Sequence, residues 1–421
     1  MDSFQDLIAT NSSEKTANGD KHFMSHMPTS LAAIHVVGTF YQVGYEVGKK
    51  FRNEIEQFYK GTSLFDDLLP FYQTSNGRQI YEEYLDITKD LYPQYVREME
   101  GIADGSGRPF HEVFLIHIEP EISTMLRTGQ GIQSTSAQCT TVMLNYIDND
   151  GRQQTVLAHN EDAIVAMPKT IPYMVHTRIT TDAESPSIAE EWSAYCYPGH
   201  IAGNCFSLNI HGLATTTNRL FPNNVQRGKI PYYIAARALL SCDSIDAAEE
   251  MIRTDMHRVA LGMSVSLAFS AVADSEQIVA NIEIAPTDTN APYGGKNYHV
   301  KRIPVASRKE EGFYFHCNRY DRIPDVAEGE EVSSDHRKRR IEALPVPSSV
   351  DDVLAIIGDT AGDERFPVYR SGKEPDYLFT AATGVFDMMA STFSIYTNNP
   401  ANGPGPVMKI PMAKRTVKKI L

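Results

Sequence analysis

The segment QCTTVMLNYIDNDGRQQTVLAHNED, from Gln138 to Asp162, decides the fold class more than any other part of the 421-residue chain. Apolar and β-branched residues fill positions 140–147, turn-forming residues follow at Asp148–Gly151, and strand character resumes at 155–158. Two such runs joined by so short a connection pair antiparallel as a β-hairpin. The segment therefore predicts an antiparallel sheet in the middle of the chain.

The turn limits which residues can face Cys139. A two-residue loop at 149–150 pairs Cys139 with Asn160, whereas a loop at 150–151 pairs it with Asp162. Side chains directly opposite on one face of a hairpin lie about 4.5–5.5 Å apart at Cβ, so a carboxylate or amide there could orient a thiol. The alternative is a small buried cysteine at the start of a core strand, with Asp162 capping the strand end.

Outward from the hairpin, the two sides of the chain are patterned differently. Residues 1–30 are polar and without a period, which predicts a disordered N-terminal tail. Apolar positions spaced by three or four predict that the segment 31–138 is mainly helical. After the hairpin, strands are expected at 171–179, 205–210, 213–217, 265–271, 278–284 and 392–396, and helices at 231–240, 245–252 and 353–357. Two groups of strands with helices outside them predict a layered α+β fold in which 31–138 and 139–421 form one integrated domain.

Composition excludes several classes of protein. Lys and Arg number 39 against 53 Asp and Glu, and the resulting net charge of -14 argues against nucleic-acid and anionic-membrane partners. The five cysteines form no CxxC or zinc-type spacing, and their odd number excludes complete intrachain pairing. The N-terminus carries no apolar signal-like run, and no long apolar segment follows. We therefore expect a soluble cytoplasmic protein without a metal, acting on a neutral or cationic small molecule.

Several short motifs, in a fixed order along residues 38–400, resemble one enzyme family. They are GTFYQVGYEVGKK at 38–50, EGIADGSG at 100–107, QCTT at 138–141, NED at 160–162, GLATTTN at 212–218, SSDHR at 333–337 and GVFD at 384–387. Together they resemble the penicillin-biosynthetic acyltransferase and β-alanyl-amine hydrolase family of N-terminal nucleophile hydrolases. Closer similarity to the arthropod hydrolases of N-β-alanyl amines in that family is carried by CYPGH at 196–200, YHV at 298–300 and NRYDR at 318–322.

The resemblance implies a fold and a maturation step. The family has two antiparallel sheets between helical layers, so a four-layer αββα sandwich is expected. Its members are made as precursors that cut their own chain before the nucleophile, here between Gln138 and Cys139. The products would be a small chain ending at 138 and a large chain, 139–421.

It also implies catalytic roles. Cys139 is expected to be the nucleophile, and its freed α-amine, with an ordinary pKa of about 7.7–8.0, would act as the base for its own side chain. Asp162 corresponds to the acid that orients this amine. Asn218 resembles the amide donor of an oxyanion hole, and Arg337 matches an arginine near the family's active site, although a solvated helix face is the alternative.

Further candidates would bind the substrate. They lie on the second strand of the hairpin, in an aromatic run and in the SSDHR motif: His159, Asn160, Glu161, Tyr195, Tyr197 and Arg337. Aromatic walls suit a catechol or imidazole ring, and a carboxylate such as Glu161, Glu119 or Glu121 suits the ammonium of a β-alanyl group. Core packing is the alternative for the aromatic residues, and a hydrogen-bonded core histidine is the alternative for His159.

The leading hypothesis is a self-processing amidohydrolase that cleaves N-β-alanyl amides of biogenic amines, such as β-alanyl-dopamine and β-alanyl-histamine, without a cofactor. Its closest rival is an N-acyltransferase that uses an acyl-CoA and the same nucleophile. An unprocessed, non-catalytic binding relative is the third, since many family members carry glycine where this chain has Gln138. The expected partners are a small-molecule amide and the two pieces of its own chain, with a homodimer left open.

Overall fold

The computed structural model describes residues 31–62, 64–128, 138–167, 171–181, 189–254, 258–269, 279–286, 297–323, 326–329 and 332–412. The tail predicted at 1–30 lies outside the described residues. Among the described residues, no helix is both long and apolar enough to cross a membrane.

The first part of the described chain is helical after one strand. The strand is β1 (Ala32–Gly38), and the helices are α1 (Phe40–Lys50), α2 (Arg52–Gly61), α3 (Leu64–Gln73), α4 (Ser75–Leu91), α5 (Pro93–Ser106), α6 (Phe110–His117) and α7 (Glu119–Thr128). Thr39 caps α1 in a capping box with Gln42. Gly107, with a φ of 75°, ends α5 in the left-handed conformation that favours glycine.

Glycines allow α1 and α5 to pack backbone against backbone. A Cβ on Gly44 of α1 would lie 2.0 Å from the Glu98 carbonyl oxygen, and a Cβ on Gly101 of α5 would lie 2.1 Å from the Tyr41 carbonyl oxygen. Any side chain at these positions would force the helices apart. The glycines of the motifs at 38–50 and 100–107 therefore allow the close packing of α1 against α5.

The remaining elements form two sheets and further helices. The strands are β2 (Gln138–Ile147), β3 (Gln153–Ile164), β4 (Tyr173–Ile179), β5 (Glu190–Cys196), β6 (Phe206–Asn209), β7 (Leu213–Arg219), β8 (Met263–Phe269), β9 (Val279–Ile284), β10 (Tyr298–Ile303), β11 (Phe313–His316), β12 (Leu378–Asp387), β13 (Thr392–Tyr396) and β14 (Met408–Pro411). The helices are α8 (Tyr232–Ala238), α9 (Ile245–Thr254), α10 (Lys309–Gly312), α11 (Val332–Glu342) and α12 (Val350–Ile357), with a 3₁₀ turn at Leu239–Ser241.

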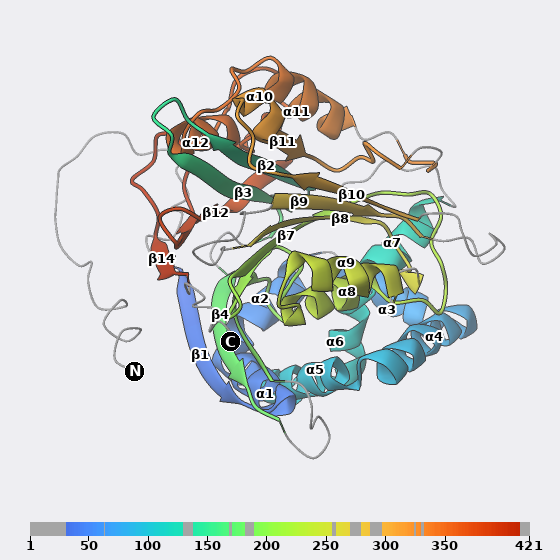
Figure 1. Cartoon of the computed structure of the whole chain (residues 1–421). Coiled ribbons are helices and arrows are strands. Elements are labelled where there is room, and N and C mark those ends of the chain that lie inside the picture. Colours follow the sequence, from blue (N-terminus) through green and yellow to red (C-terminus); the bar gives the residue numbers. More distant parts are fainter. Residues whose placement is uncertain are drawn as a thin grey trace, which may run out of the picture.

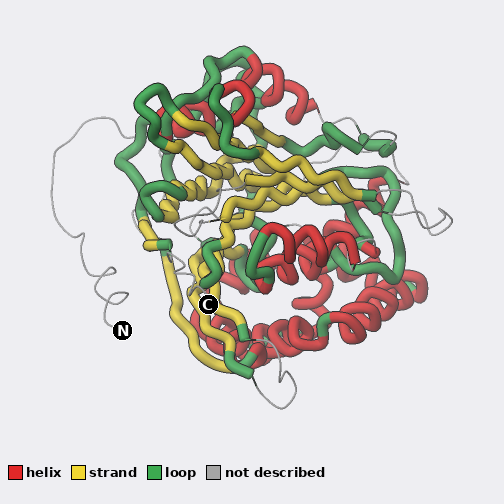
Figure 2. The backbone as a smooth tube through the Cα atoms, in the orientation of Figure 1, coloured by secondary structure: helices red, strands yellow, loops and turns green. Residues whose placement is uncertain are grey.

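The two sheets lie face to face with helices outside them (Figure 1). One sheet has the order β1-β4-β5-β6-β7-β8-β9-β10 and the other β11-β2-β3-β12-β13-β14. Helices α10, α11 and α12 lie beyond the second sheet, and the long helices lie on the side of the first (Figures 1 and 2). Aromatic rings fill the space between the sheets, where Phe206 meets Phe393 edge to face at 5.9 Å. The predicted α+β class is confirmed.

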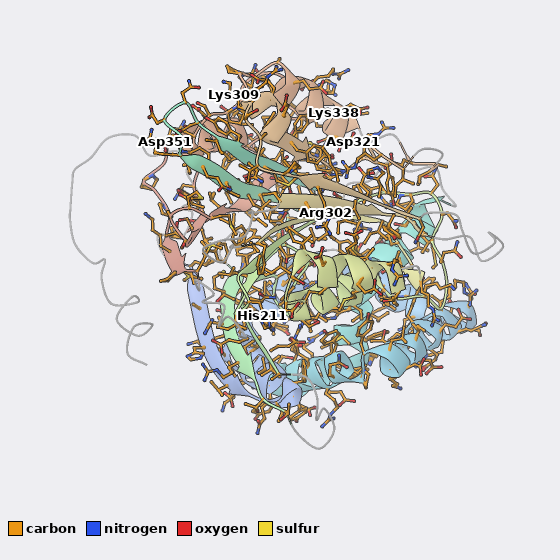
Figure 3. All side chains as sticks on the ribbon, viewed as in Figure 1. His211, Arg302, Lys309, Asp321, Lys338 and Asp351 are labelled. Atoms are coloured by element: carbon orange, nitrogen blue, oxygen red, sulfur yellow. The ribbon has the colours of Figure 1, made fainter. Side chains whose placement is uncertain are left out.

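At the surface, ion pairs connect helix α9 to strand β10. Arg302 of β10, labelled in Figure 3, donates to Asp246 and Glu249 of α9 at 2.5 and 2.6 Å. Such exposed pairs add little stability each. The buried apolar core therefore holds these layers together.

The hairpin exists, but both predicted registers are wrong by one residue. Its connection is Asp148–Arg152 rather than a two-residue loop, because the Asp148 carboxylate accepts hydrogen bonds from the backbone amides of Asp150 and Arg152 at 3.0 and 2.8 Å. Cys139 consequently lies directly opposite Glu161, and Gln138 lies opposite Asp162. A shift of one residue changes which face each side chain occupies.

Candidate active site

The β2–β3 hairpin presents different polar groups on its two faces. Directly opposed residues share a face, so one face carries Cys139 with Glu161 and, two residues along, Thr141 with His159. These side chains point between the two sheets, since Thr141 bonds Asn218 of β7 at 2.7 Å. The other face carries Gln138 and Asp162 and turns toward α11 and the loop before β12.

Cys139 lies near the open end of the hairpin, away from the turn, and is 5% exposed. Its thiol donates to Oε2 of Glu161 at 3.5 Å. Burial, and then the negative charge of Glu161, raises the pKa of the Cys139 thiol well above its ordinary value. The thiol is therefore neutral at pH 7.

Glu161 is buried among polar side chains. Tyr197 donates its hydroxyl to Oε1 at 2.9 Å, and His159 Nε2 lies 3.3 Å from Oε2. Among the described residues, no lysine or arginine forms an ion pair with this carboxylate. The side chains that contact it include Cys139, His159 and Tyr197.

The hydrogen bonds around His159 assign its ring protons. Thr141 has one hydroxyl proton, which goes to Asn218 Oδ1 at 2.7 Å. Thr141 must then accept from His159 Nδ1, 2.8 Å away, so that nitrogen carries a proton. The other ring nitrogen faces Glu161, and a second proton there would make an ion pair.

Both sides of the Gln138-Cys139 peptide are held by buried polar groups. The Cys139 amide donates to Asn318 Oδ1 at 3.1 Å. Arg337 of α11 donates to the Cys139 carbonyl oxygen, to Gln138 Oε1 at 3.1 Å and to Asn318 Oδ1 at 2.8 Å. Arg337 is fully buried, so its alternative as a solvated surface residue is wrong. A planar five-donor guanidinium is suited to holding several acceptors at once.

Asp162 lies on the opposite face from the thiol. Thr380 donates to its Oδ1 at 2.7 Å, while Oδ2 is buried without a hydrogen-bond partner among the described residues. Burial raises the pKa of Asp162 to about 7, against the opposing effect of Arg337 and Arg370. An unpaired buried carboxylate oxygen is costly, so this position favours a donor beyond those that the described residues supply.

Other predicted residues lie at varying distances from the thiol. Asn218 is buried and reaches Cys139's face only through Thr141, with its own amide nitrogen 3.4 Å from the His316 carbonyl oxygen. Tyr195 is buried near Glu161 and stacks on Phe206 at 4.9 Å. Tyr197 touches Glu161 directly.

Asn160 lies on the face away from the thiol. Its amide nitrogen donates to the carbonyl oxygens of Ile357 and Val368 at 2.7 and 3.1 Å, and its oxygen accepts from Thr383 at 2.6 Å. These bonds anchor α12 and the loop before β12 to the sheet. In the uncut chain, its position is structural.

The other acids considered for a substrate ammonium have protein partners. Glu119 accepts from Ser123 at 2.5 Å, and Glu121 accepts the Tyr232 backbone amide at 2.7 Å. Of the three carboxylates, Glu161 is the one bonded to the Cys139 thiol. The single tryptophan, Trp192, belongs to a separate buried cluster around Arg237.

Sequence patterns did not identify two residues of the site, Asn318 and Arg370. Arg370 is fully buried, donates to Gln138 Oε1 at 3.3 Å and forms a buried ion pair with Asp376 at 2.6 Å. Asn318 stood in the family-like run NRYDR, which was a usable signal for it. No local pattern marks Arg370 as part of the site, since Gln138 and Ser333, which it contacts there, lie far away in the sequence.

Within the described part of the chain, two groups of side chains could reach a metal ion. One is Cys139, His159 and Glu161, whose ligand atoms lie within 4.8 Å of one another, and the other is Glu283, His316 and Asp321. Glu283 already accepts from His316 and from the backbone amides of the loop 321–323. That second group therefore has a structural role in which a carboxylate binds a loop.

A hollow of about 730 Å³ lies at the turn end of the hairpin, beside Tyr146, Asp148 and Lys309. At the opposite end of the hairpin, the hydrogen-bonded thiol, the polar contacts of Gln138 and Cys139, and the carboxylates of Glu161 and Asp162 form one buried polar cluster between the layers of the α+β fold.

Comparison with known proteins agrees with that class of site. Residues 149–402 match the family model described as Acyl-coenzyme A:6-aminopenicillanic acid acyl-transferase, a range that includes Asp162, Asn218 and Arg337 and begins after Cys139. The chain is also similar to the beta-alanyl-dopamine/carcinine hydrolase of Drosophila melanogaster, with 31% identity over 379 residues, covering 88% of this chain and 94% of the relative. The chain belongs to this acyl-transferase family and is an enzyme, and its relatives indicate amide hydrolysis as its class of chemistry.

Proposed function

We propose that the chain is a self-processing amidohydrolase that uses Cys139 as an N-terminal nucleophile and cleaves N-β-alanyl amides of biogenic amines. The observation that carries this proposal is the buried Cys139 thiol beside a peptide bond clamped by Arg337 and Asn318. The two face-to-face sheets with outer helices support assignment to the N-terminal nucleophile hydrolase fold. Cutting at Gln138-Cys139 would place a free amine and a thiol on one residue.

The unpaired oxygen of Asp162 supports the cut. Asp162 lies directly opposite Gln138, and its Oδ2 has no partner among the described residues of the uncut chain. Cleavage would create an ammonium at Cys139, which follows Gln138 on strand β2. The carboxylate would then gain a charge-assisted partner and orient the amine that serves as base.

The mature enzyme would act through an acyl-enzyme. The Cys139 amine takes the thiol proton, Sγ attacks the substrate carbonyl carbon, and the protonated amine gives its proton to the leaving amine. Water then hydrolyses the thioester and restores the thiol. No step in this sequence requires a metal or a cofactor.

The substrate proposal rests on the relative and on charge. The similar Drosophila protein is named for beta-alanyl-dopamine and carcinine. In this chain a buried carboxylate, Glu161, lies beside the thiol, and two tyrosines lie near that carboxylate. An ammonium entering a buried site needs such a partner. Aromatic rings at Tyr195 and Tyr197 would suit the aromatic part of the amine.

The family name favours one rival, an acyltransferase that passes the acyl group from a CoA thioester to an amine. The same acyl-enzyme can be opened by water or by an amine. A non-catalytic, unprocessed relative is the third possibility.

The two pieces would remain associated after cleavage. Strand β1 from the first piece pairs in parallel with β4 from the second, from Ala32 opposite Tyr173 to Gly38 opposite Ile179. One hydrophobic core contains buried residues from both, including Phe51, which stacks on Tyr173. The five cysteines are all free, which supports our expectation of a reducing compartment such as the cytoplasm.

One experiment tests the proposal against its rivals. Purified protein is incubated with β-alanyl-histamine or β-alanyl-dopamine, with and without CoA, and free β-alanine is measured. Release of β-alanine without CoA supports the hydrolase. Transfer that requires an acyl-CoA supports the acyltransferase, and an inactive, intact 47.0 kDa chain supports the binding relative.

A further inference from the structure

The proposed self-cleavage needs a base that the mature mechanism does not provide. In the uncut chain, the nitrogen of Cys139 is an amide, which donates to Asn318 and has no basic lone pair. The Cys139 thiol is nevertheless neutral at pH 7, because burial and Glu161 raise its pKa. Some other group must take the thiol proton in the first and only turnover of the precursor.

Glu161 is placed to take that proton. Its Oε2 is the acceptor of the Cys139 thiol at 3.5 Å, and direct cross-strand pairing holds the two residues together. A candidate base must lie within hydrogen-bond reach of its proton before its pKa is considered, and this one does. Asp162 cannot serve, because its carboxylate lies on the other face of the hairpin with Thr380.

His159 supports Glu161 in this position. Its Nδ1 is committed to donating to Thr141, which leaves Nε2 facing Oε2 of Glu161 at 3.3 Å. A neutral imidazole would present a lone pair to the carboxylate, whereas an imidazolium forms a favourable ion pair. The histidine would therefore keep Oε2 of Glu161 aimed at the thiol.

We propose that Glu161 is the general base for self-cleavage of the precursor and that His159 is its positioning residue, an inference that rests on the proposed self-processing function. Glu161 Oε2 takes the thiol proton as Sγ bonds to the Gln138 carbonyl carbon. The carbon–nitrogen bond to Cys139 then breaks, and Glu161 returns the proton to the leaving nitrogen. Water hydrolyses the resulting thioester, which leaves a carboxylate on Gln138 and a thiol with a free α-amine on Cys139.

Several titratable groups lie around Glu161. They are Cys139 from β2, His159 from β3, Tyr195 and Tyr197 from β5 and the turn after it, Cys205 before β6, and Tyr232 and Tyr233 from α8, while the adjacent Asp162 lies on the opposite face of the hairpin. Burial raises the pKa of each of these tyrosines and cysteines. These tyrosines and cysteines remain neutral at pH 7 and offer no basic group, so the proton goes to Glu161, the carboxylate that the thiol already contacts.

The test follows cleavage of newly made full-length chain at pH 7 in cell-free synthesis with a pulse of labelled amino acid. Wild type is expected to give fragments that meet at Gln138-Cys139, and Glu161→Gln is expected to cut at least about 100-fold more slowly. Glu161→Asp should cut at an intermediate rate. The matched control is Glu191→Gln, the same change at a carboxylate of β5 that pairs with Arg178 of β4, and it should cut like wild type.

A pH shift separates a missing base from a misfolded chain. Purified uncut Glu161→Gln is moved from pH 7 to pH 9.5, where hydroxide can remove the thiol proton, and its cleavage should accelerate steeply at the same bond. Wild-type cleavage rates for Glu161→Gln at pH 7 would overturn the inference, as would a natively folded Glu161→Gln that stays intact at pH 9.5. A wild-type chain that is never cut would instead remove the self-processing proposal, and this inference with it.

Discussion

Asp162 lies directly across the hairpin from Gln138, on the opposite face from the Cys139 side chain. Glu161, its neighbour, holds the thiol. The two acids therefore have separate positions, one beside the sulfur and one beside the peptide that is proposed to be cut. This division predicts that their substitutions affect different steps.

Asp162→Asn should leave self-cleavage of the chain unchanged and slow the hydrolysis of substrate. The amide keeps the packing and the bond to Thr380, while the new amine of Cys139 loses its carboxylate partner. We expect normal conversion to two pieces and hydrolysis of β-alanyl amides slowed by about 10²-fold or more. Steady-state kinetics on fully cut protein measure this, and a wild-type kcat for the variant would remove the role assigned to Asp162.

The same residue should affect stability in a pH-dependent way. The folded pKa of Asp162 is raised to about 7, above its ordinary value near 4, so the folded chain binds more protons than the unfolded chain between these limits. Stability due to this group is present at low pH and is lost as the pH rises from about 4 to 7. In a Cys139→Ala background, adding Asp162→Asn should raise the free energy of unfolding at pH 7.5, by on the order of 1 kcal/mol, relative to its effect at pH 4.5.

Denaturant titrations of the single and double variants at both pH values measure that difference. The comparison between variants is needed because burial also raises the pKa values of Glu98 and Glu121 to about 7. Their contributions cancel when the two variants are subtracted. An effect of Asp162→Asn that is the same at both pH values would contradict the raised pKa.

Arg337→Lys should slow the cut while keeping a positive charge. Lysine cannot reproduce the planar donors that reach Gln138, the Cys139 carbonyl and Asn318 together. Cleavage should fall by about tenfold or more, with a loss of about 1–3 kcal/mol in stability. Arg340→Lys on the same helix, which loses only the bidentate contact with Asp359, is the control and should cut normally.

The sequence predicted the existence of the hairpin but not its register. Turn residues and alternation locate β2 and β3, yet the connection follows from the Asp148 side chain binding two backbone amides, which a two-residue turn does not anticipate. Strand β12 escaped prediction because it is buried along nearly all its length and lacks alternation. Its Thr380 pairs with Asp162, more than two hundred residues earlier in the chain.

Some residues of the candidate site could be predicted from the sequence and others could not. Residues on the hairpin itself could be named from the sequence because strand pairing brings them together. Asn318, Arg337 and Arg370 converge on Gln138 and Cys139 only through the packing of α11 and later loops on the sheet. The family-like motifs carried Arg337, whereas Arg370 required the tertiary structure.

Gly101→Ala should destabilise the helical layer. The added methyl group would meet the Tyr41 carbonyl oxygen at 2.1 Å, so α1 and α5 must separate, at a cost of about 2 kcal/mol or more. Gly329→Ala is the control, since the nearest atom to its Cβ would be 3.9 Å away. Thermal melting in the Cys139→Ala background should show a lower Tm for the first variant alone, and equal melting temperatures would contradict the close approach.

Substitution of Cys139 separates the nucleophile from the fold. Cys139→Ala removes the atom that must attack the Gln138 carbonyl, so we expect one uncut 47.0 kDa chain without activity, whereas wild type should give pieces of about 15 and about 32 kDa. The larger wild-type piece should begin Cys-Thr-Thr-Val on N-terminal sequencing. Loss of one buried sulfur costs a few kcal/mol at most, so the alanine variant should still fold.

Cys139→Ser keeps an attacking atom that is a poorer nucleophile near neutral pH, so slow cleavage should persist while amide hydrolysis falls by orders of magnitude. Cleavage at residue 138 together with β-alanyl-amine hydrolysis by folded Cys139→Ala would falsify the mechanism.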